Sequence, residues 1–161
     1  MNSSKKGLGI IIILAPFIFT CHFLEESPGF VDWFNAHVGR GITTGLFWNV
    51  NSTVLVITLI VMLIELIEPS GFSASLIILW LSFLMLANAI FHITGAIADQ
   101  HYMPGLITAI ALYLPFYLFV VIRLVKKKRL NLISTFVLAI FGSAPMLIHG
   151  YLIVFRGSRL F

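Results

Sequence analysis

The sequence places an imidazole and two carboxylates together near the end of its first long apolar stretch. His22, Glu25 and Glu26 lie in the string CHFLEESPG. Residues spaced i, i+3 and i+4 share one face of an α-helix, so the spacing predicts that the three side chains lie together. Imidazole and carboxylate are common ligands of zinc, iron and manganese, and they also transfer protons. Ionisable groups are costly inside an apolar helix, so they indicate a functional site.

Other polar side chains recur at a similar depth in later apolar stretches. His92 follows Asn88 by about one helical turn, and His149 lies in the last stretch. With a rise of about 1.5 Å per residue, these residues and His22 are expected in one layer, roughly 5–10 Å below one membrane surface. The sequence therefore predicts a polar site shared by three helices.

The composition predicts that lipid surrounds most of this chain. Of 161 residues, 60% are hydrophobic and 10% are charged, and the mean hydropathy is +1.06. Soluble domains carry about 25% charged residues. Five apolar stretches are long enough to span a bilayer as helices, namely residues 7–26, 46–67, 72–98, 104–125 and 130–155. We expect an all-α, polytopic membrane helix bundle that forms a single transmembrane domain over residues 1–161.

Two segments outside this pattern need an interpretation. Residues 30–40, FVDWFNAHVGR, place aromatic side chains near one helix face, which predicts a short interfacial helix. The N-terminal lysines and the apolar run after them are similar to a signal peptide. Because four more spans follow, we expect this run to be retained as the first span.

Two single residues have ordinary structural interpretations. Cys21 is the only cysteine, which excludes an internal disulfide and a cysteine-based zinc cluster. Glu65, near the end of the second span, is expected to be an interfacial acid without a catalytic role.

The basic residues predict the orientation in the membrane, because inner loops carry an excess of Lys and Arg. With the N-terminus inside, seven of the ten basic residues lie inside and three outside. The inner set is Lys5, Lys6, Arg123, Lys126, Lys127, Lys128 and Arg129, and the outer set is Arg40, Arg156 and Arg159. An odd number of spans then places the C-terminus outside. Because the basic residues gather at helix ends, the net charge of +4 indicates contact with the lipid bilayer, and we expect no nucleic acid partner.

Three short motifs resemble those of the HXXEE-domain family of small integral membrane proteins. They are HFLEE at residues 22–26, NAIFH at residues 88–92 and YMPG at residues 102–105, in this order. The resemblance covers nearly the whole chain and implies a site built from these motifs. Because the family is functionally uncharacterised, the resemblance leaves the reaction open. His149 is not among these motifs and is a candidate from its depth alone.

The favoured interpretation is a transition-metal centre. His22, His92 and His149 with Glu25 would form the ligand set, with a position left for water; zinc is the first choice and iron the second. The catalytic candidates are Glu26 as general base, Asn88 to orient a ligand or bind a substrate oxygen, and Tyr102 as a hydrogen-bond donor. Such a centre would hydrolyse a lipid-like substrate that enters from the bilayer at the outer side.

Three alternatives stay open. A metal-free acid–base site could serve an isomerase or cyclase of an isoprenoid or sterol-like substrate. A haem held by His92 and another span is less favoured, because the sequence carries no other haem signal. The histidines and glutamates could also stabilise helix packing or line a small transporter. A bundle of this size would need to form a homo-oligomer to support alternating access.

Overall fold

The computed structural model describes residues 8–157, and all regular structure within that range is helical. The predicted membrane helix bundle is confirmed, because five helices are long and apolar enough to cross a bilayer. They cover Gly9–Glu26, Thr44–Ile67, Gly71–Asp99, Leu106–Lys126 and Leu132–Arg156. Every end lies within two residues of the predicted one. The reason is physical: the thickness of the hydrocarbon layer sets the length of an apolar run.

Three of the five spans consist of more than one helical segment. The first contains the 3₁₀ segment η2 (Gly9–Ile13) and α1 (Leu14–Glu26), whereas α3 (Thr44–Ile67) and α8 (Leu132–Arg156) are continuous. The third contains α4 (Gly71–Leu81), the π-helical η3 (Ser82–Ala87) and α5 (Asn88–Asp99). The fourth contains α6 (Leu106–Thr108), the π-helical η4 (Ala109–Tyr113) and α7 (Leu114–Lys126). The predicted short helix is α2 (Phe30–His37), which ends before residue 40.

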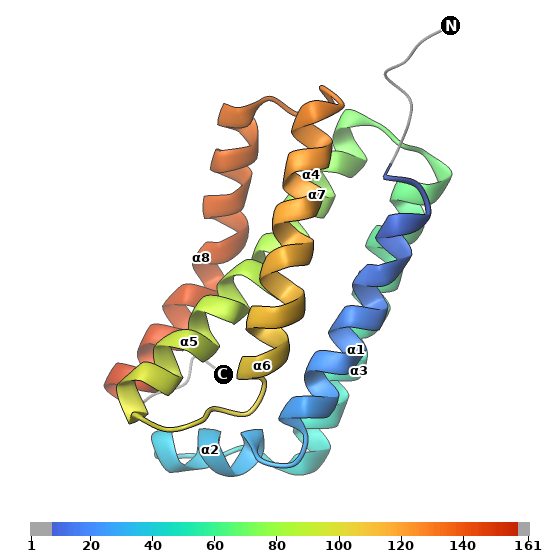
Figure 1. The fold of residues 1–161 in the computed structure, drawn as a ribbon. Helices are drawn as coiled ribbons and strands as arrows, with labels where there is room; N and C mark the ends of the chain where they lie inside the picture. The colour runs from blue at the N-terminus through green and yellow to red at the C-terminus, as the bar shows by residue number, and fades with distance from the viewer. Residues whose placement is uncertain (1–7, 158–161) are drawn as a thin grey trace, which may run out of the picture.

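Figure 1 shows how the two ends of the bundle differ. Helix α2 lies across one end, next to the connection between α5 and α6. The α3–α4 turn and the α7–α8 connection lie at the opposite end, so the basic residues 126–129 are far from α2. The N-terminus-inside orientation stays a prediction, and Lys5, Lys6 and Arg159, which contributed to it, lie outside the described residues.

The third span forms the centre of the bundle. In its most apolar stretch 56% of residues are buried, against 22–39% in the other four spans. Helix α8 approaches it closely at Gly142, where an added Cβ would lie 2.3 Å from the carbonyl oxygen of Leu79. Small residues at such crossings allow the backbone contact that stabilises helix pairs in lipid. The third span therefore provides the fixed element against which the others are positioned.

The two π-helical segments have local causes. Pro115 follows η4 and has no N–H, so the carbonyl group one turn earlier lacks its helical donor. In η3 the carbonyl oxygen of Ser82 accepts a hydrogen bond from Ser143 Oγ on α8, at 3.2 Å. Segments of this kind are frequent at functional sites because they change the direction of the side chains that follow. Here η3 directly precedes α5, which carries His92, and η4 ends at Tyr113.

A buried ion pair closes the end of the bundle opposite to α2. Glu65 is 1% exposed and forms a bidentate ion pair with Arg129. It also accepts hydrogen bonds from Ser73 Oγ at 2.7 Å and from the backbone N–H of Leu8 at 2.8 Å. The expectation of an interfacial acid at this position was therefore wrong: Glu65 is buried because four hydrogen-bond donors surround it.

Candidate metal centre

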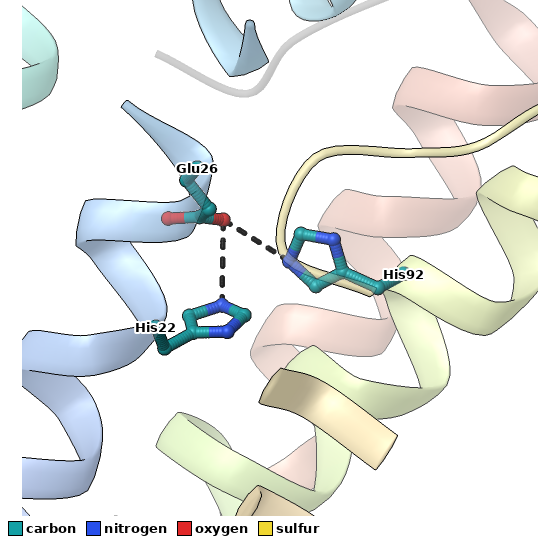
Figure 2. Close-up of side chains that lie close together, drawn as sticks. All are labelled: His22, Glu26 and His92. Carbon is teal, nitrogen blue, oxygen red and sulfur yellow. Dashed lines mark ion pairs between the residues drawn. The ribbon is translucent and has the colours of Figure 1, made fainter. Parts of the chain in front are cut away.

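Three ionisable side chains from two spans meet inside the bundle, close to the end covered by α2. His22 and Glu26 come from successive turns of α1, and His92 comes from α5 (Figure 2). Glu26 Oε1 lies 3.0 Å from His92 Nε2 and 3.5 Å from His22 Nε2. The exposed fractions of His22, Glu26 and His92 are 1%, 5% and 0%, so the group is shielded from bulk solvent.

The two short contacts in this group are ion pairs when the histidines are protonated, and the same spacing would also suit shared ligation. Both histidine Nε2 atoms are buried and have no hydrogen-bond partner among the described residues, despite their short distances to the carboxylate. One ligand atom from each residue lies within 4.8 Å of the other two. Metal bonds of about 2.0 Å place ligand atoms about 3.3 Å apart around a tetrahedral ion. The observed 3.0 and 3.5 Å lie on either side of that value.

A hydrogen bond to Thr108 determines which nitrogen of His22 faces the group. His22 Nδ1 lies 2.8 Å from Thr108 Oγ1, and this hydroxyl donates its own proton to the carbonyl oxygen of Gly105 at 3.3 Å. The hydroxyl oxygen therefore accepts the Nδ1–H of His22. In the tautomer with the proton on Nδ1, the free Nε2 faces Glu26, as a metal ligand requires.

The connection between α5 and α6 covers the three side chains. Gly105 has a φ of +94° and lies against all of them. A Cβ at this position would come within 2.7 Å of His92 Cε1, and within 2.9 Å of Glu26 Cγ and His22 Cε1. Only glycine combines this backbone conformation with so close an approach. The backbone at Gly105 therefore forms one wall of the site.

Aromatic rings form further walls. The ring of Tyr113 lies 4.2 Å from the ring of His22, and Phe30 on α2 lies 6.1 Å from the ring of His92. Tyr113 is fully buried, and its hydroxyl group has no hydrogen-bond partner in the described part of the chain. The surroundings of the three ionisable side chains are thus largely apolar.

Glu25 has a different set of partners from Glu26. Its carboxylate accepts hydrogen bonds from the backbone N–H groups of Ile107 at 3.0 Å and Thr108 at 2.7 Å, and from Tyr102 Oη at 2.5 Å. These amides belong to the first turn of α6, where they lack helical acceptors. Burial and the bond to Glu25 raise the pKa of Tyr102 to about 12, so the phenol stays a donor at neutral pH. Glu25 therefore anchors the connection that carries Gly105.

The sequence-based candidates divide into those that the structure brings together and those that it does not. His22, His92 and Glu26 meet, whereas Glu25 and Tyr102 bind each other at the edge of the site. Glu26 thus lies beside the histidines, where Glu25 was expected as ligand, and Glu25 instead holds the start of α6.

Two further candidates lie apart from the ligand group. His149, on α8, is half-buried and does not belong to the set of converging ligand atoms. Asn88 begins α5 one turn before His92, and its Oδ1 is buried without a partner in the described range. The geometry therefore gives neither residue a place among the three ligands.

The sequence reasoning missed Thr108 and Tyr113. Threonine is ordinary in an apolar helix, where it usually bonds to its own backbone, and a tyrosine is usually interpreted as an interfacial aromatic. Tyr113 could have been recognised from its position in the middle of the fourth span, because a phenol there needs a hydrogen-bond partner.

Comparison with known proteins agrees with the motifs. The family described as a protein of unknown function with an HXXEE motif matches residues 13–120. The chain belongs to this HXXEE family. No curated protein matches the chain, and no solved structure matches it. The matched region includes His22, Glu26, His92 and the connection with Gly105, whereas α8 with His149 lies beyond it.

The HXXEE motif thus contains two glutamates that face different neighbours. The second, Glu26, faces the histidines, and the first, Glu25, holds the start of α6. The strings HFLEE, NAIFH and YMPG, far apart in the sequence, meet at one place in this chain.

A second polar cluster attaches α2 over this place. His37 Nε2 lies 2.9 Å from Asp99 Oδ1, and Trp33 Nε1 donates a hydrogen bond to Asp99 Oδ2 at 2.6 Å. The rings of Trp33 and His37 are stacked at 4.2 Å. Although burial lowers the pKa of His37, its hydrogen bonds to the Trp33 carbonyl and to Asp99 raise the pKa above its usual value. This cluster joins α2 to the end of α5 and so keeps Phe30 against His92.

Proposed function

We propose that the chain is a membrane-embedded metalloenzyme whose metal ion is held by His22, His92 and Glu26. The supporting observation is the convergence of two imidazole nitrogens and one carboxylate oxygen, all buried, at spacings near those of a tetrahedral ligand set. Buried polar atoms without partners are costly in a membrane, where no water replaces the missing bonds. A bound cation would give both histidine Nε2 atoms a partner at once.

Three protein ligands indicate a catalytic centre more than a structural one. Structural zinc sites use four protein ligands, whereas catalytic zinc keeps one position for water or substrate, and a His₂Glu set is typical of zinc hydrolases. Iron is the second choice, because two histidines and one carboxylate also bind Fe(II) with open positions. When bound, either ion would supply Lewis acidity and lower the pKa of a bound water.

The surroundings favour a lipid-like substrate and hydrolysis. Glu26 is the last residue of α1, so the ligand set lies near one end of a spanning helix, at the level where lipid ester groups meet the hydrocarbon layer. The walls formed by Phe30 and Tyr113 are apolar and aromatic. We assign this end to the outer membrane surface, as the distribution of basic residues predicts. Glu26 acts in this proposal as a ligand, and Glu25 positions the covering connection.

Metal analysis of the purified protein tests the proposal directly. Wild type should contain near one equivalent of zinc or iron, and His22→Ala, His92→Ala and Glu26→Gln should each lose most of it. His149→Ala and Glu25→Gln are the matched controls and should retain the metal. In Glu25→Gln an amide oxygen remains to accept from the α6 backbone. Equal metal content in all six proteins, or none in wild type, would end the metalloenzyme proposal.

A metal-free acid–base site is the second candidate, supported by one specific distance. Glu26 Oε1 lies 3.0 Å from His92 Nε2, close enough for proton transfer once the groups are aligned. Such a pair suits an isomerase or cyclase of an isoprenoid or sterol-like substrate. A wild-type protein free of metal, from cells supplied with zinc and iron, would favour this candidate.

A further inference from the structure

The hydroxyl group of Tyr113 is a buried polar atom beside the ligand set, and the contacts described so far give it no role. The residue is 0% exposed, and the hydroxyl has no hydrogen-bond partner among residues 8–157. Its ring lies against the ring of His22 at 4.2 Å, with 35° between the planes. Tyr113 is therefore next to one of the three proposed ligands, His22.

A purely structural role does not account for this hydroxyl. Phenylalanine would provide the same ring contact with His22 and would not bury an unpaired donor, which is costly in protein and more so in lipid. Tyr117, one turn later on the same span, shows the usual solution, because its hydroxyl forms a 2.8 Å hydrogen bond with Ser82 Oγ. The Tyr113 hydroxyl lacks such a partner in the described part of the chain, which indicates that its partner is a molecule bound at the site.

We propose that Tyr113 donates a hydrogen bond to the oxygen ligand that occupies the open position of the metal centre. That ligand is water at rest and a carbonyl or carboxylate oxygen of the substrate during turnover. The inference rests on the proposed metal centre and adds to it a catalytic residue and an oxygen-centred substrate group. A fixed donor directed at an oxygen that gains negative charge stabilises the transition state in acyl transfer. The substrate class is accordingly a carboxylic ester with a long apolar part.

The backbone at Tyr113 departs from a regular α-helix. Tyr113 is the last residue of the π-helical segment η4, and Pro115 lies just beyond it. A π-helical turn contains an extra residue, so it rotates the side chains that follow relative to an uninterrupted α-helix. Tyr113 packs against His22 on α1, and Tyr117 binds Ser82 of the third span.

Binding of acetate to the cobalt-loaded protein tests this role without knowledge of the natural substrate. Wild type, Tyr113→Phe and Tyr117→Phe are loaded with Co²⁺, and the visible spectrum of the ion is followed during an acetate titration. We expect near one equivalent of cobalt in all three proteins. Tyr113→Phe should bind acetate roughly 10–100-fold more weakly, as for the loss of one hydrogen bond to a charged oxygen. Tyr117→Phe should match wild type, because its hydroxyl bonds to Ser82.

The outcomes separate the inference from the function on which it rests. Unchanged acetate affinity in Tyr113→Phe, with cobalt retained, overturns the role of Tyr113 and leaves the metal centre in place. Loss of cobalt in this variant also overturns it, because the phenol would then be a metal ligand. Equal weakening in both tyrosine variants assigns the effect to helix packing and rejects the proposal. Absence of cobalt binding in wild type removes the proposed function and the inference together.

Discussion

The close contact of Gly105 with all three proposed ligands makes Gly105→Ala the most informative single substitution. The glycine has a φ of +94°, and a Cβ would lie 2.7 Å from His92 Cε1 and 2.9 Å from carbons of Glu26 and His22. Ordinary contact begins at 3.4 Å, so the imidazole of His92 or the backbone must move by about 0.7 Å. Ligand distances in a metal site tolerate only about ±0.2 Å. We expect the metal affinity to fall by at least about tenfold.

Gly105→Ala should lower stability for two reasons, and the same substitution at a second glycine separates them. A positive φ costs alanine about 1–2 kcal/mol, and overpacking at a buried position adds about 1–3 kcal/mol. Gly105→Ala should therefore lower the free energy of unfolding by about 2–5 kcal/mol. Gly9 has a φ of +68°, and a Cβ added there would meet nothing within 4 Å, so Gly9→Ala should show the backbone part alone.

Thermal unfolding and cobalt titration of the detergent-purified proteins check both parts. For a chain of this size 1 kcal/mol corresponds to roughly 2–4 °C, so the Tm of Gly105→Ala should fall by roughly 4–20 °C. The Tm of Gly9→Ala should fall less, and this protein should bind cobalt as wild type does. The reasoning would be refuted if Gly105→Ala bound cobalt with wild-type affinity and lost no more stability than Gly9→Ala.

Three further predictions concern other parts of the bundle. Glu65→Gln leaves Arg129 buried without its charge partner and should lower the free energy of unfolding by about 3–5 kcal/mol with the metal content unchanged, as thermal unfolding and metal analysis would show. Because the bond to Asp99 raises the pKa of His37, their stabilising pair is complete below about pH 6.5 and is lost as pH rises through the folded-state pKa. His37→Gln should therefore lower the Tm more at pH 5.5 than at pH 9, and an equal difference at both values would contradict this. A single cysteine at Lys128 in an otherwise cysteine-free protein should react with an impermeant reagent only from the cytoplasmic face; labelling from outside would reverse the predicted orientation.

The parts of this molecule that could be predicted are those that depend on one physical constraint. The five spans follow from run length, because the hydrocarbon layer requires about 20 apolar residues per helix. His22, Glu26 and His92 stood out because ionisable groups rarely occur in such runs without a function. The three side chains meet across two helices, as expected for residues that lie at the same depth in the membrane.

The parts that could not be predicted depend on contacts between distant segments. Spacing alone makes Glu25 and Glu26 equivalent neighbours of His22, and only the position of α6 gives each its partners. Depth gives the level of His149 in the membrane, but it does not give the side of α8 from which the side chain projects. Although His149 is expected at the same level as His22 and His92, it does not join their group. The partner of Glu65 is Arg129, 64 residues away, which no local pattern indicates.

The hydrogen bonds around Glu25 explain why the site and its cover behave as one unit. Glu25 holds the first turn of α6, that turn places Thr108 against His22 Nδ1, and the residue before it, Gly105, covers the ligands. A change at Glu25 should therefore affect the proposed metal centre through the position of this turn. Glu25→Ala, which removes both acceptor oxygens, should weaken metal binding modestly, whereas Glu26→Gln should abolish it. The order of these two effects distinguishes a glutamate that positions the site from one that binds the ion.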